Sequence, residues 1–248
     1  MGEQRVLITG ASSGIGEQLA LDYAANGWQV IACGRNLEAL GALHQQHDNI
    51  KPLSFDINSL GSIKQALADV AAKDLDLVIL NAGVCEYIDT PMQFDSALFE
   101  RVIQTNVIAV GYCLEAMLPC IRTGGRIALM SSSASFLSLP RAEAYGASKA
   151  AVSYLAHTLA IDIAPKQLGV SVIHPGFVKT PLTDKNDFPM PMRISVEQAS
   201  AAIRTDLAKG KTEINFPGRF TWILKTMALL PTSLWRWMAR KGLAGSNQ

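Results

Sequence analysis

A phenol, an amine and a hydroxyl lie in one part of the sequence at spacings that suit proton transfer. Tyr145 and Lys149 are four positions apart in the segment YGASK, and Ser132 precedes Tyr145 by thirteen positions. On a helix, positions i and i+4 lie one turn apart on the same face. A nearby cation favours the phenolate and lowers its pKa. A phenol that exchanges a proton near neutral pH suits the interconversion of a carbonyl and an alcohol.

The shift that this chemistry requires of Tyr145 is large but attainable. A free tyrosine titrates near pH ~10, so a pKa of about 7 needs roughly 4 kcal/mol of preferential phenolate stabilisation. A close ammonium, together with a positively charged oxidised nicotinamide, supplies energies of this order in a partly desolvated site. Three serines run from Ser131 to Ser133, and the spacing to Tyr145 selects Ser132, with Ser133 as the alternative.

A glycine-rich segment, TGASSGIG, directly follows the apolar run of residues 6–8. Glycines permit a tight turn and close backbone approach, and the start of the following helix faces a pyrophosphate. A structural turn is the alternative, but a position between a strand and a helix favours dinucleotide binding. The predicted phosphate-binding residues are Gly10, Ser12, Ser13, Gly14, Ile15 and Gly16.

The residues after the second predicted strand indicate which dinucleotide is used. An acidic residue there binds the ribose hydroxyls of NAD, whereas this chain has Cys33-Gly34-Arg35-Asn36. Arg35 offers a fork-shaped cation for a 2′-phosphate, so we predict NADP(H) in preference to NAD(H). The alternative is that Arg35 is a solvated loop residue.

Three further candidates are polar or small residues that lie at the ends of predicted strands or within a predicted helix. Asp56 closes the third strand, where it either binds the adenine amino group or caps the next helix. Asn81, Ala82 and Gly83 close the fourth strand and let the chain pass near the cofactor ribose. Asn106 lies in an apolar helical stretch, either as a satisfied buried amide that kinks its helix or as a residue that holds water next to Lys149. The two roles of Asn106 are compatible.

Strand-like and helix-like segments alternate along the chain. This order predicts an α/β fold, a doubly wound, Rossmann-like parallel sheet of about seven strands with helices on both faces. The strand segments are rich in Val, Ile and Leu with little polar alternation, as in a sheet covered on both faces. The predicted strands are 6–9, 29–33, 52–55, 75–80, 125–131, 170–174 and 212–216, and the clearest helices are 14–26, 95–121 and 145–164.

We expect one Rossmann-like domain over residues 1–248, with a dinucleotide-binding and catalytic core at 1–208. Residues 209–248 should add the last strand and a basic, Trp-rich helical extension that Pro231 splits in two. This segment contains seven Lys or Arg residues and a single Glu. It is either a packing element over the pocket, a helix at a membrane surface or a subunit contact.

Taken in order, the motifs resemble those of short-chain dehydrogenases/reductases of the compact, single-domain branch. The resemblance covers roughly residues 5 to 210. It rests on TGASSGIG, Asp56, the NAG at 81–83, Asn106, Ser132, YGASK and the PGFVKT at 175–180. Leu80 departs from the pattern, since many relatives have a second Asn before NAG.

The resemblance implies a role for each matching residue. Tyr145 would be the general acid/base, Ser132 would hold the substrate oxygen, and Lys149 would bind the nicotinamide ribose and lower the pKa of Tyr145. Asn106 would complete a proton relay. In PGFVKT, the resemblance implies that Thr180 bonds the carboxamide and that the backbone of Pro175, Gly176 and Val178 lines the nicotinamide.

Bulk properties restrict the class of partner and the location. A net charge of +1 argues against nucleic acid as a partner. The four cysteines lack metal-ligand spacing, so we expect reduced thiols and no metal. No apolar run reaches the ~18 residues that span a bilayer, and the first strand begins too early for a signal peptide. We expect a cytoplasmic protein, partly membrane-associated if its C-terminal segment binds lipid.

Together these features predict an NADP(H)-dependent oxidoreductase that acts on a carbonyl or secondary alcohol of a fairly apolar small molecule. The pocket walls should come from residues 84–87, from 135–137 and from the loop at 182–194, which is rich in Met and Pro. The resemblance implies a homo-oligomer, a dimer or tetramer, that forms through helices 95–121 and 145–164, and the alternative is that these helices only pack on the sheet. The alternative is a non-catalytic nucleotide sensor, or a membrane-associated protein, on the same fold.

Overall fold

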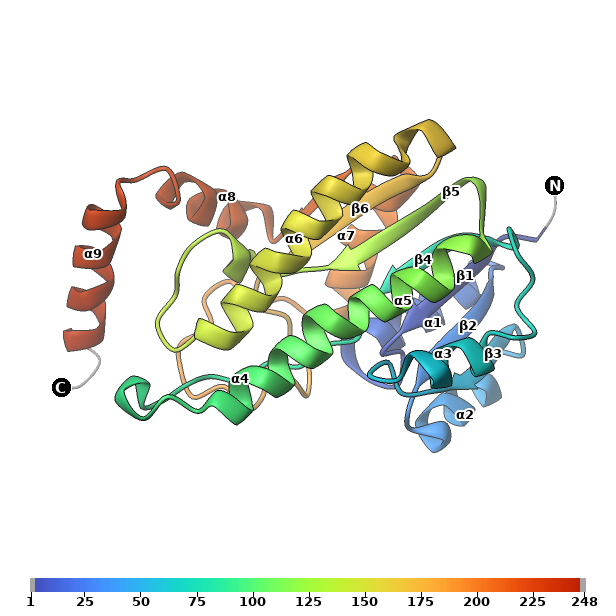
Figure 1. The fold of residues 1–248 in the computed structure, drawn as a ribbon, viewed down its shortest axis with the longest axis horizontal. Helices are drawn as coiled ribbons and strands as arrows, with labels where there is room; N and C mark the ends of the chain where they lie inside the picture. The colour runs from blue at the N-terminus through green and yellow to red at the C-terminus, as the bar shows by residue number, and fades with distance from the viewer. Residues whose placement is uncertain (1–2, 246–248) are drawn as a thin grey trace.

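The computed structural model describes residues 3–245, with side chains to residue 241. Its described strands form one sheet, all parallel, in the order β3-β2-β1-β4-β5-β6-β7 (Figure 1). The prediction of a doubly wound, Rossmann-like parallel sheet is therefore confirmed. The strands are β1 (Arg5–Thr9), β2 (Gln29–Gly34), β3 (Ile50–Ser54), β4 (Leu75–Leu80), β5 (Ile121–Met130), β6 (Gly169–Pro175) and β7 (Glu213–Phe216).

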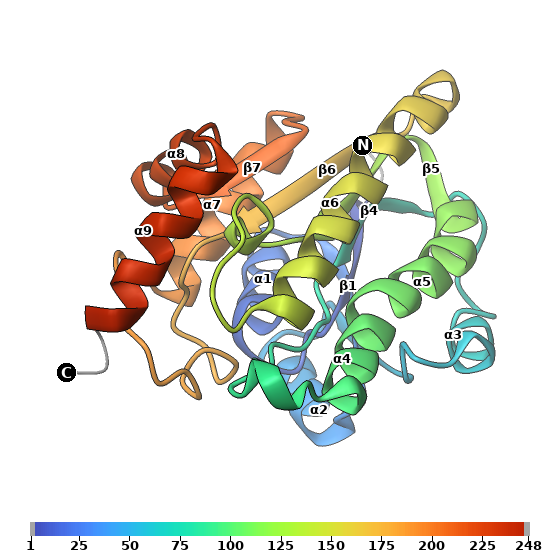
Figure 2. The same ribbon diagram turned by 60° about the vertical axis from the view of Figure 1, so that its left-hand side comes forward.

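Helices cover both faces of the sheet, as predicted (Figures 1 and 2). The first face packs against α1 (Gly14–Ala25), α2 (Leu37–Gln46) and α7 (Val196–Ala208), and the second against α3 (Leu60–Ala66), α5 (Ala109–Met117) and α6 (Glu143–Ile163). Alternation along β1 divides the core. Val6 and Ile8 belong to the first face and Leu7 to the second. Three further helices are α4 (Ser96–Ile103), α8 (Gly218–Met227) and α9 (Thr232–Gly245).

The strand order creates a crevice at the carboxyl ends of β1 and β4. From β1 the chain passes outward to β2 and β3, then returns to form β4 on the other side of β1. Ligands bind in such folds where the order reverses, outside the carboxyl ends of the strands. The loops after β1, β4, β5 and β6 therefore meet at one edge of the sheet, and these loops contain the predicted site residues.

The predicted long helix at 95–121 differs in detail from the structure. A π-helical turn, Gln104–Ile108, separates α4 from α5, and a short 3-10 turn, Leu118–Cys120, follows α5. The π turn centres on Asn106, whose side chain bonds to the neighbouring loop instead of facing solvent. Pro119 cannot continue the helix, and β5 begins at Ile121, earlier than the predicted residue 125.

The stretch Ser96–Cys120 has the length and composition of a membrane span, with a mean hydropathy of 1.3 over its most apolar window. The sequence reasoning, which looked for one unbroken apolar run, did not identify it. Length and composition do not separate a span from a helix packed on a sheet. In this structure 39% of the window is buried, and Val102 and Met117 lie fully inside the core.

Candidate active site

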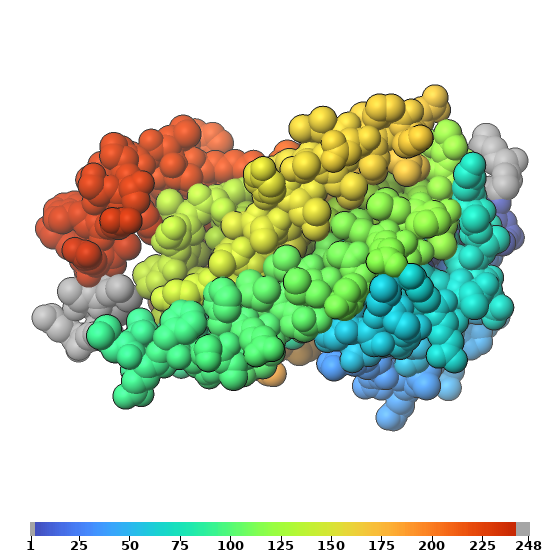
Figure 3. Space-filling view, viewed as in Figure 1, coloured from blue at the N-terminus to red at the C-terminus, as the bar shows by residue number. Residues whose placement is uncertain are grey.

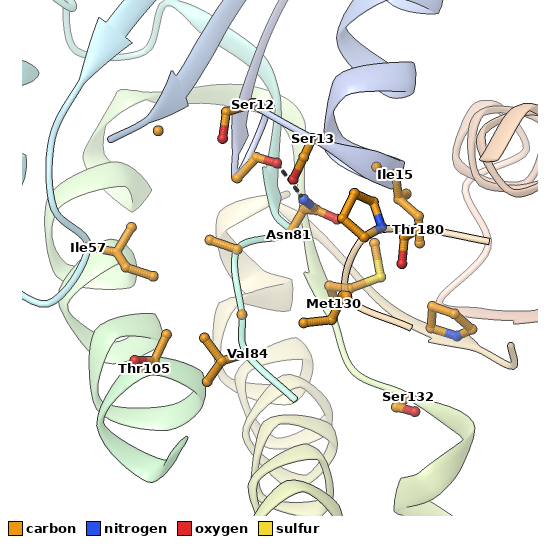
Figure 4. A pocket seen from close by; sticks show the side chains of 18 of the residues that line it. Ser12, Ser13, Ile15, Ile57, Asn81, Val84, Thr105, Met130, Ser132 and Thr180 are labelled. Carbon is orange, nitrogen blue, oxygen red and sulfur yellow. Dashed lines mark hydrogen bonds between the residues drawn. The ribbon is translucent and has the colours of Figure 1, made fainter. Parts of the chain in front are cut away.

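A cavity of about 530 Å³ lies at the carboxyl edge of the sheet (Figure 4). Loops that follow six different strands contribute to its walls. Every predicted site residue except Gly16 and Asn106 lines the cavity. These residues are Gly10, Ser12, Ser13, Gly14, Ile15, Arg35, Asp56, Asn81, Ala82, Gly83, Ser132, Tyr145, Lys149, Pro175, Gly176, Val178 and Thr180.

The turn after β1 depends on its glycines. Gly10 and Gly14 have φ of 67° and 59°, a region that side chains disfavour. A Cβ on Gly10 would lie 2.8 Å from Ala82 Cα, so the turn and the loop after β4 touch through backbone. Gly16 lies behind the turn, where a Cβ would be 2.2 Å from the Gly10 carbonyl oxygen. Gly16 thus has a packing role that lets α1 approach the turn, and its predicted contact with a cofactor stays a prediction.

Hydrogen bonds fix this turn against the end of β4. The Thr9 hydroxyl accepts from the backbone N–H groups of Asn81 (3.0 Å) and Ala82 (3.1 Å). The Asn81 amide donates to the carbonyls of Thr9 (3.0 Å) and Gly10 (3.2 Å). The cradle thus presents glycine backbone and small side chains to the cavity. A Cβ at either turn glycine would meet neighbouring protein atoms, and the turn precedes the start of α1, the position at which helices bind phosphate groups.

The end of β2 presents Arg35 to the same cavity. Arg35 lies between β2 and α2, and its side chain is exposed. Asn36 caps α2, since its side chain accepts from the Ala39 N–H at 3.1 Å. Arg35 is therefore held by short connections on both sides and remains available to a ligand.

Asp56 does not cap the following helix, contrary to one of its two predicted roles. Ser59 caps α3 by accepting from the Ser62 N–H at 3.2 Å. The Asp56 carboxylate accepts from the backbone N–H of Asn58 at 3.0 Å and from its side-chain amide at 3.3 Å. This turn places the carboxylate at the cavity wall, which leaves adenine binding as its remaining predicted role.

Ser132 follows β5 and belongs to the cavity wall. Its hydroxyl accepts from the Ala134 N–H at 3.1 Å, which orients it at the start of a short 3-10 turn. Ser133 is buried and does not line the cavity. Ser131 points toward α6 and donates to the Lys149 carbonyl at 2.8 Å. The structure therefore favours Ser132 over Ser133 as the site serine.

Tyr145 and Lys149 lie on the first turns of α6 and face the same space. The Lys149 Nζ atom lies 5.8 Å from the centre of the Tyr145 ring and donates to the Met130 carbonyl at 2.9 Å. A Cβ on Gly83 would lie 3.3 Å from Lys149 Nζ and 3.0 Å from Asn106 Oδ1. A side chain at Gly83 would therefore press on both the lysine and the asparagine.

Asn106 is a fully bonded buried amide. Its Oδ1 accepts from the Val84 N–H at 2.8 Å, and its Nδ2 donates to the Val84 carbonyl and the Ser148 hydroxyl, both at 2.9 Å. Only 1% of its surface is exposed. These bonds join the loop after β4 to α6, so the side chain holds the site together from behind. Its predicted role of holding water next to Lys149 stays a prediction.

Burial shifts the pKa values of Tyr145 and Lys149 in opposite directions. Burial raises the pKa of the Tyr145 phenol well above its usual value, the nearby Cys85 thiol raises it further, and the Ser132 hydroxyl acts against both. The sequence reasoning expected the opposite direction, because it counted the lysine charge and a bound oxidised nicotinamide in a site that it took to be only partly desolvated. Burial also lowers the pKa of Lys149 from 10.5 to about 8, since an ammonium loses hydration inside the protein.

The buried ammonium predicts a pH-dependent stability cost. Between about pH 8 and 10.5 the unfolded chain binds more protons at Lys149 than the folded chain, so stability rises with pH across this window. Lys149→Met should therefore stabilise the protein at pH 7, by up to about 3 kcal/mol. The gain should shrink as the pH approaches 10.5. Chemical denaturation of both proteins across this range measures it, and a gain that is constant with pH would contradict the assignment.

A buried polar network, which the sequence reasoning missed, supports α6. His174, 1% exposed, contacts the Ser153 hydroxyl at 3.1 Å, and Ser153 contacts the Ser131 hydroxyl at 2.7 Å. On its other side, His174 Nδ1 lies 3.3 Å from a Glu213 carboxylate oxygen. Burial raises the pKa of Glu213, but the contacts with His174 and His157 outweigh it and lower the pKa to about 2. The carboxylate therefore stays charged and holds His174 in place.

Tyr87 and Phe188, which are not among the residues that line the cavity, form an aromatic wall beside Tyr145. The Tyr87 ring lies 6.4 Å from the Tyr145 ring and 5.2 Å from Phe188, which belongs to the loop after β6. Arg141 lies over both Tyr87 and Phe188, and it pairs with Asp89 and Asp187, at 2.6 and 2.8 Å. These contacts join three loops, two of which, 84–87 and 182–194, were predicted pocket walls.

The segment after β6 is anchored at both ends. Gly176 lies against α8, where a Cβ would be 2.7 Å from the Phe220 ring, and Val178 is buried in the core. Thr180 packs on the glycine turn, since a Cβ on Gly14 would lie 3.1 Å from its methyl group. Several cavity-lining residues carried no motif and were not predicted. They include Phe55, Ile57, Asn58, Thr105, Met130 and Pro181.

Comparison with known proteins identifies the family. A model described as short chain dehydrogenase matches residues 4–189. An uncharacterized oxidoreductase of Myxococcus xanthus is 33% identical over 97% of this chain and 98% of its own. A 3beta-hydroxysteroid dehydrogenase of Mediterraneibacter gnavus is 30% identical over 85% of this chain and 81% of its own. The chain therefore belongs to the short-chain dehydrogenases, oxidoreductases that typically use a nicotinamide cofactor.

A solved structure supports the same assignment at the level of the fold. The closed form of serine dehydrogenase complexed with NADP+ is 25% identical to this chain, with a TM-score of 0.78. The alignment covers 86% of this chain and 94% of that one. The family predicted from the ordered motifs is thus confirmed.

Proposed function

We propose that this protein is an NADP(H)-dependent oxidoreductase that interconverts a carbonyl and a secondary alcohol on a fairly apolar small molecule. The observation that carries the proposal is the meeting of Ser132, Tyr145 and Lys149 at the wall of one cavity that also contains the glycine cradle. A nucleotide sensor needs the cradle but not a buried acid beside it, so the intact set favours an enzyme over a non-catalytic protein.

The roles of the side chains follow from their positions. A bound reduced nicotinamide supplies hydride to the carbonyl carbon. The Ser132 hydroxyl donates a hydrogen bond to the carbonyl oxygen, and Tyr145 gives that oxygen its proton as the alcohol forms. Burial keeps the phenol protonated in the free protein, which is the state that a proton donor needs. Lys149 and Asn106 hold the ribose side of the site and the path by which Tyr145 regains a proton.

The preference for NADP(H) rests on Arg35 and the absence of a carboxylate beside it at the end of β2. A guanidinium binds a 2′-phosphate through charge-assisted, paired hydrogen bonds. The NADP+ complex of the similar serine dehydrogenase is consistent with this preference.

The aromatic wall and its paired charges support a neutral, apolar substrate. Arg141, the cation nearest the Tyr87 ring, is matched by Asp89 and Asp187, and Glu86 is matched by Arg101 at 2.7 Å. The relative that acts on a 3β-hydroxysteroid is consistent with such a substrate.

Further proposals concern partners and location. The outer face of α6 leaves Tyr154 and Ile161 77% and 75% exposed, which supports a homo-oligomer, a dimer or tetramer, in which α6 contacts a second copy. Light scattering of the purified chain measures its mass. We also propose a cytoplasmic location with peripheral membrane contact through the C-terminal segment.

The activity is tested with a panel of neutral ketones and aldehydes, aromatic, alicyclic and straight-chain, mixed with NADPH or NADH. We expect at least one apolar carbonyl to be reduced, with a higher kcat/KM for NADPH, as read from the absorbance of the reduced nicotinamide. Oxidation of the matching alcohols with NADP+ checks the reverse direction. Turnover limited to charged carbonyls would contradict the substrate class, and faster turnover with NADH would contradict the cofactor.

A further inference from the structure

The C-terminal arm, residues 218–241, consists of α8 and the described part of α9, and it stands out at one end of the molecule (Figures 1 and 3). Pro231 lies between the two helices, as the sequence predicts. Within residues 232–241 of α9, Trp235 and Ala239 are half-buried and the remaining side chains are exposed. A helix that packs so little against its own fold keeps a face for another surface.

That face of α9 is apolar. Leu234, Trp237 and Met238 follow the i, i+3, i+4 spacing of one helical face, and they are 42%, 55% and 38% exposed. Lys241 continues the face one turn further, and its ammonium lies 4.1 Å from the centre of the Trp237 ring. The arm exposes more apolar surface at Trp222 and Leu229, which are 68% and 85% exposed.

The charge of the arm selects among possible partners. From residue 214 to the end, the sequence has five basic residues and no acidic one. Docking of this arm on the same arm of a second copy would place like charges together, because a two-fold contact pairs each patch with itself. An apolar helical face containing Trp, flanked by Lys and Arg, matches the interface of an anionic bilayer instead. The basic residues are Arg219, Lys225, Arg236, Arg240 and Lys241.

The base of the arm contacts the loops that follow Ser132 and Gly176, two residues of the cavity wall. The Trp235 indole N–H donates to the Ser138 carbonyl at 2.8 Å, in the loop that follows Ser132. In α8, Phe220 lies 5.4 Å from the Phe177 ring, and Lys225 lies 4.8 Å from the Phe136 ring. A surface bound to the arm would therefore lie on the side of the molecule where apolar substrates are expected to enter.

We propose that the exposed face of α9, formed by Leu234, Trp237 and Met238, docks the protein on an anionic phospholipid surface through apolar insertion and flanking basic residues. Docking would bring the substrate-side loops to the bilayer, from which an apolar substrate is drawn. The proposal that the substrate comes from the bilayer rests on the proposed reductase activity. The proposal that α9 docks on the lipid surface does not, and it is measured without turnover.

The test uses the full-length protein and vesicles of phosphatidylcholine with or without phosphatidylserine. We expect the wild type to sediment with the anionic vesicles, and much less with phosphatidylcholine alone or at high salt. Trp237→Ser should weaken binding by about tenfold, the effect of one lost large apolar side chain. Arg236→Gln with Arg240→Gln should weaken binding to anionic vesicles only.

The matched control is Leu37→Ser on α2, which removes a side chain that is 60% exposed at the other end of the sheet (Figure 1). It should bind vesicles like the wild type. Melting curves confirm that each variant is folded. If the wild type does not sediment with anionic vesicles, the proposal is overturned. This includes the case in which light scattering shows that Trp237 joins two copies of the protein instead. An equal loss of binding in Leu37→Ser would overturn it as well.

Discussion

Tyr145→Phe is expected to lower turnover by about 10³-fold while NADPH binds as tightly as to the wild type. The phenol is the proton donor in the proposed reaction, and loss of a positioned acid typically costs 10²–10⁴-fold. The phenyl ring keeps the packing against Tyr87, whose ring centre lies 6.4 Å away. The affinity for NADPH, measured by fluorescence titration, should therefore differ from that of the wild type by no more than about twofold. This corresponds to a few tenths of a kcal/mol in binding free energy.

Tyr154→Phe is the matched control. It removes a phenolic hydroxyl from the same helix, at a side chain that is 77% exposed. Its turnover should equal that of the wild type. If Tyr145→Phe retained substantial turnover, another group would be the acid, and the assignment of Tyr145 would be wrong.

Arg35→Asp is expected to reverse the cofactor preference. Removing the guanidinium takes away a charge-assisted contact worth about 1.5–3 kcal/mol, and the new carboxylate repels a 2′-phosphate while it accepts hydrogen bonds from ribose hydroxyls. The ratio of kcat/KM for NADPH to that for NADH should fall by about 10²-fold or more. Steady-state kinetics with both cofactors and one carbonyl substrate measure this ratio.

Arg35→Gln separates the two contributions. It removes the charge without adding repulsion, so the ratio should fall toward equality without reversing. The exposed position of Arg35 makes a folding defect an unsuitable explanation for any change. An unchanged preference in Arg35→Asp would leave Arg35 as a solvated loop residue.

Much of the site was predictable because its motifs lie at strand ends. Parallel strands align their carboxyl ends at one edge, so the residues after β1, β4, β5 and β6 had to meet once the strands were identified. The glycine turn, Asn81, Ser132 and Tyr145 followed from this rule. The prediction needed the element order and not the detailed packing.

Features that depend on burial or on packing between loops could not be read from the sequence. The direction of the Tyr145 pKa shift depends on how deeply α6 buries the phenol. The position of Gly16 behind the turn depends on the close approach of α1. Tyr87 and Phe188 come from loops far apart in sequence, and their contact has no local pattern that would predict it.

The central claim is that Ser132, Tyr145 and Lys149 surround a nicotinamide held by the glycine cradle. A crystal structure of the protein with NADP+ tests it most directly. The account predicts the pyrophosphate at the turn of Gly10 and Gly14, the 2′-phosphate beside Arg35, and the nicotinamide ribose within hydrogen-bond distance of Lys149. A dinucleotide bound elsewhere, or a nicotinamide distant from Tyr145, would contradict the account.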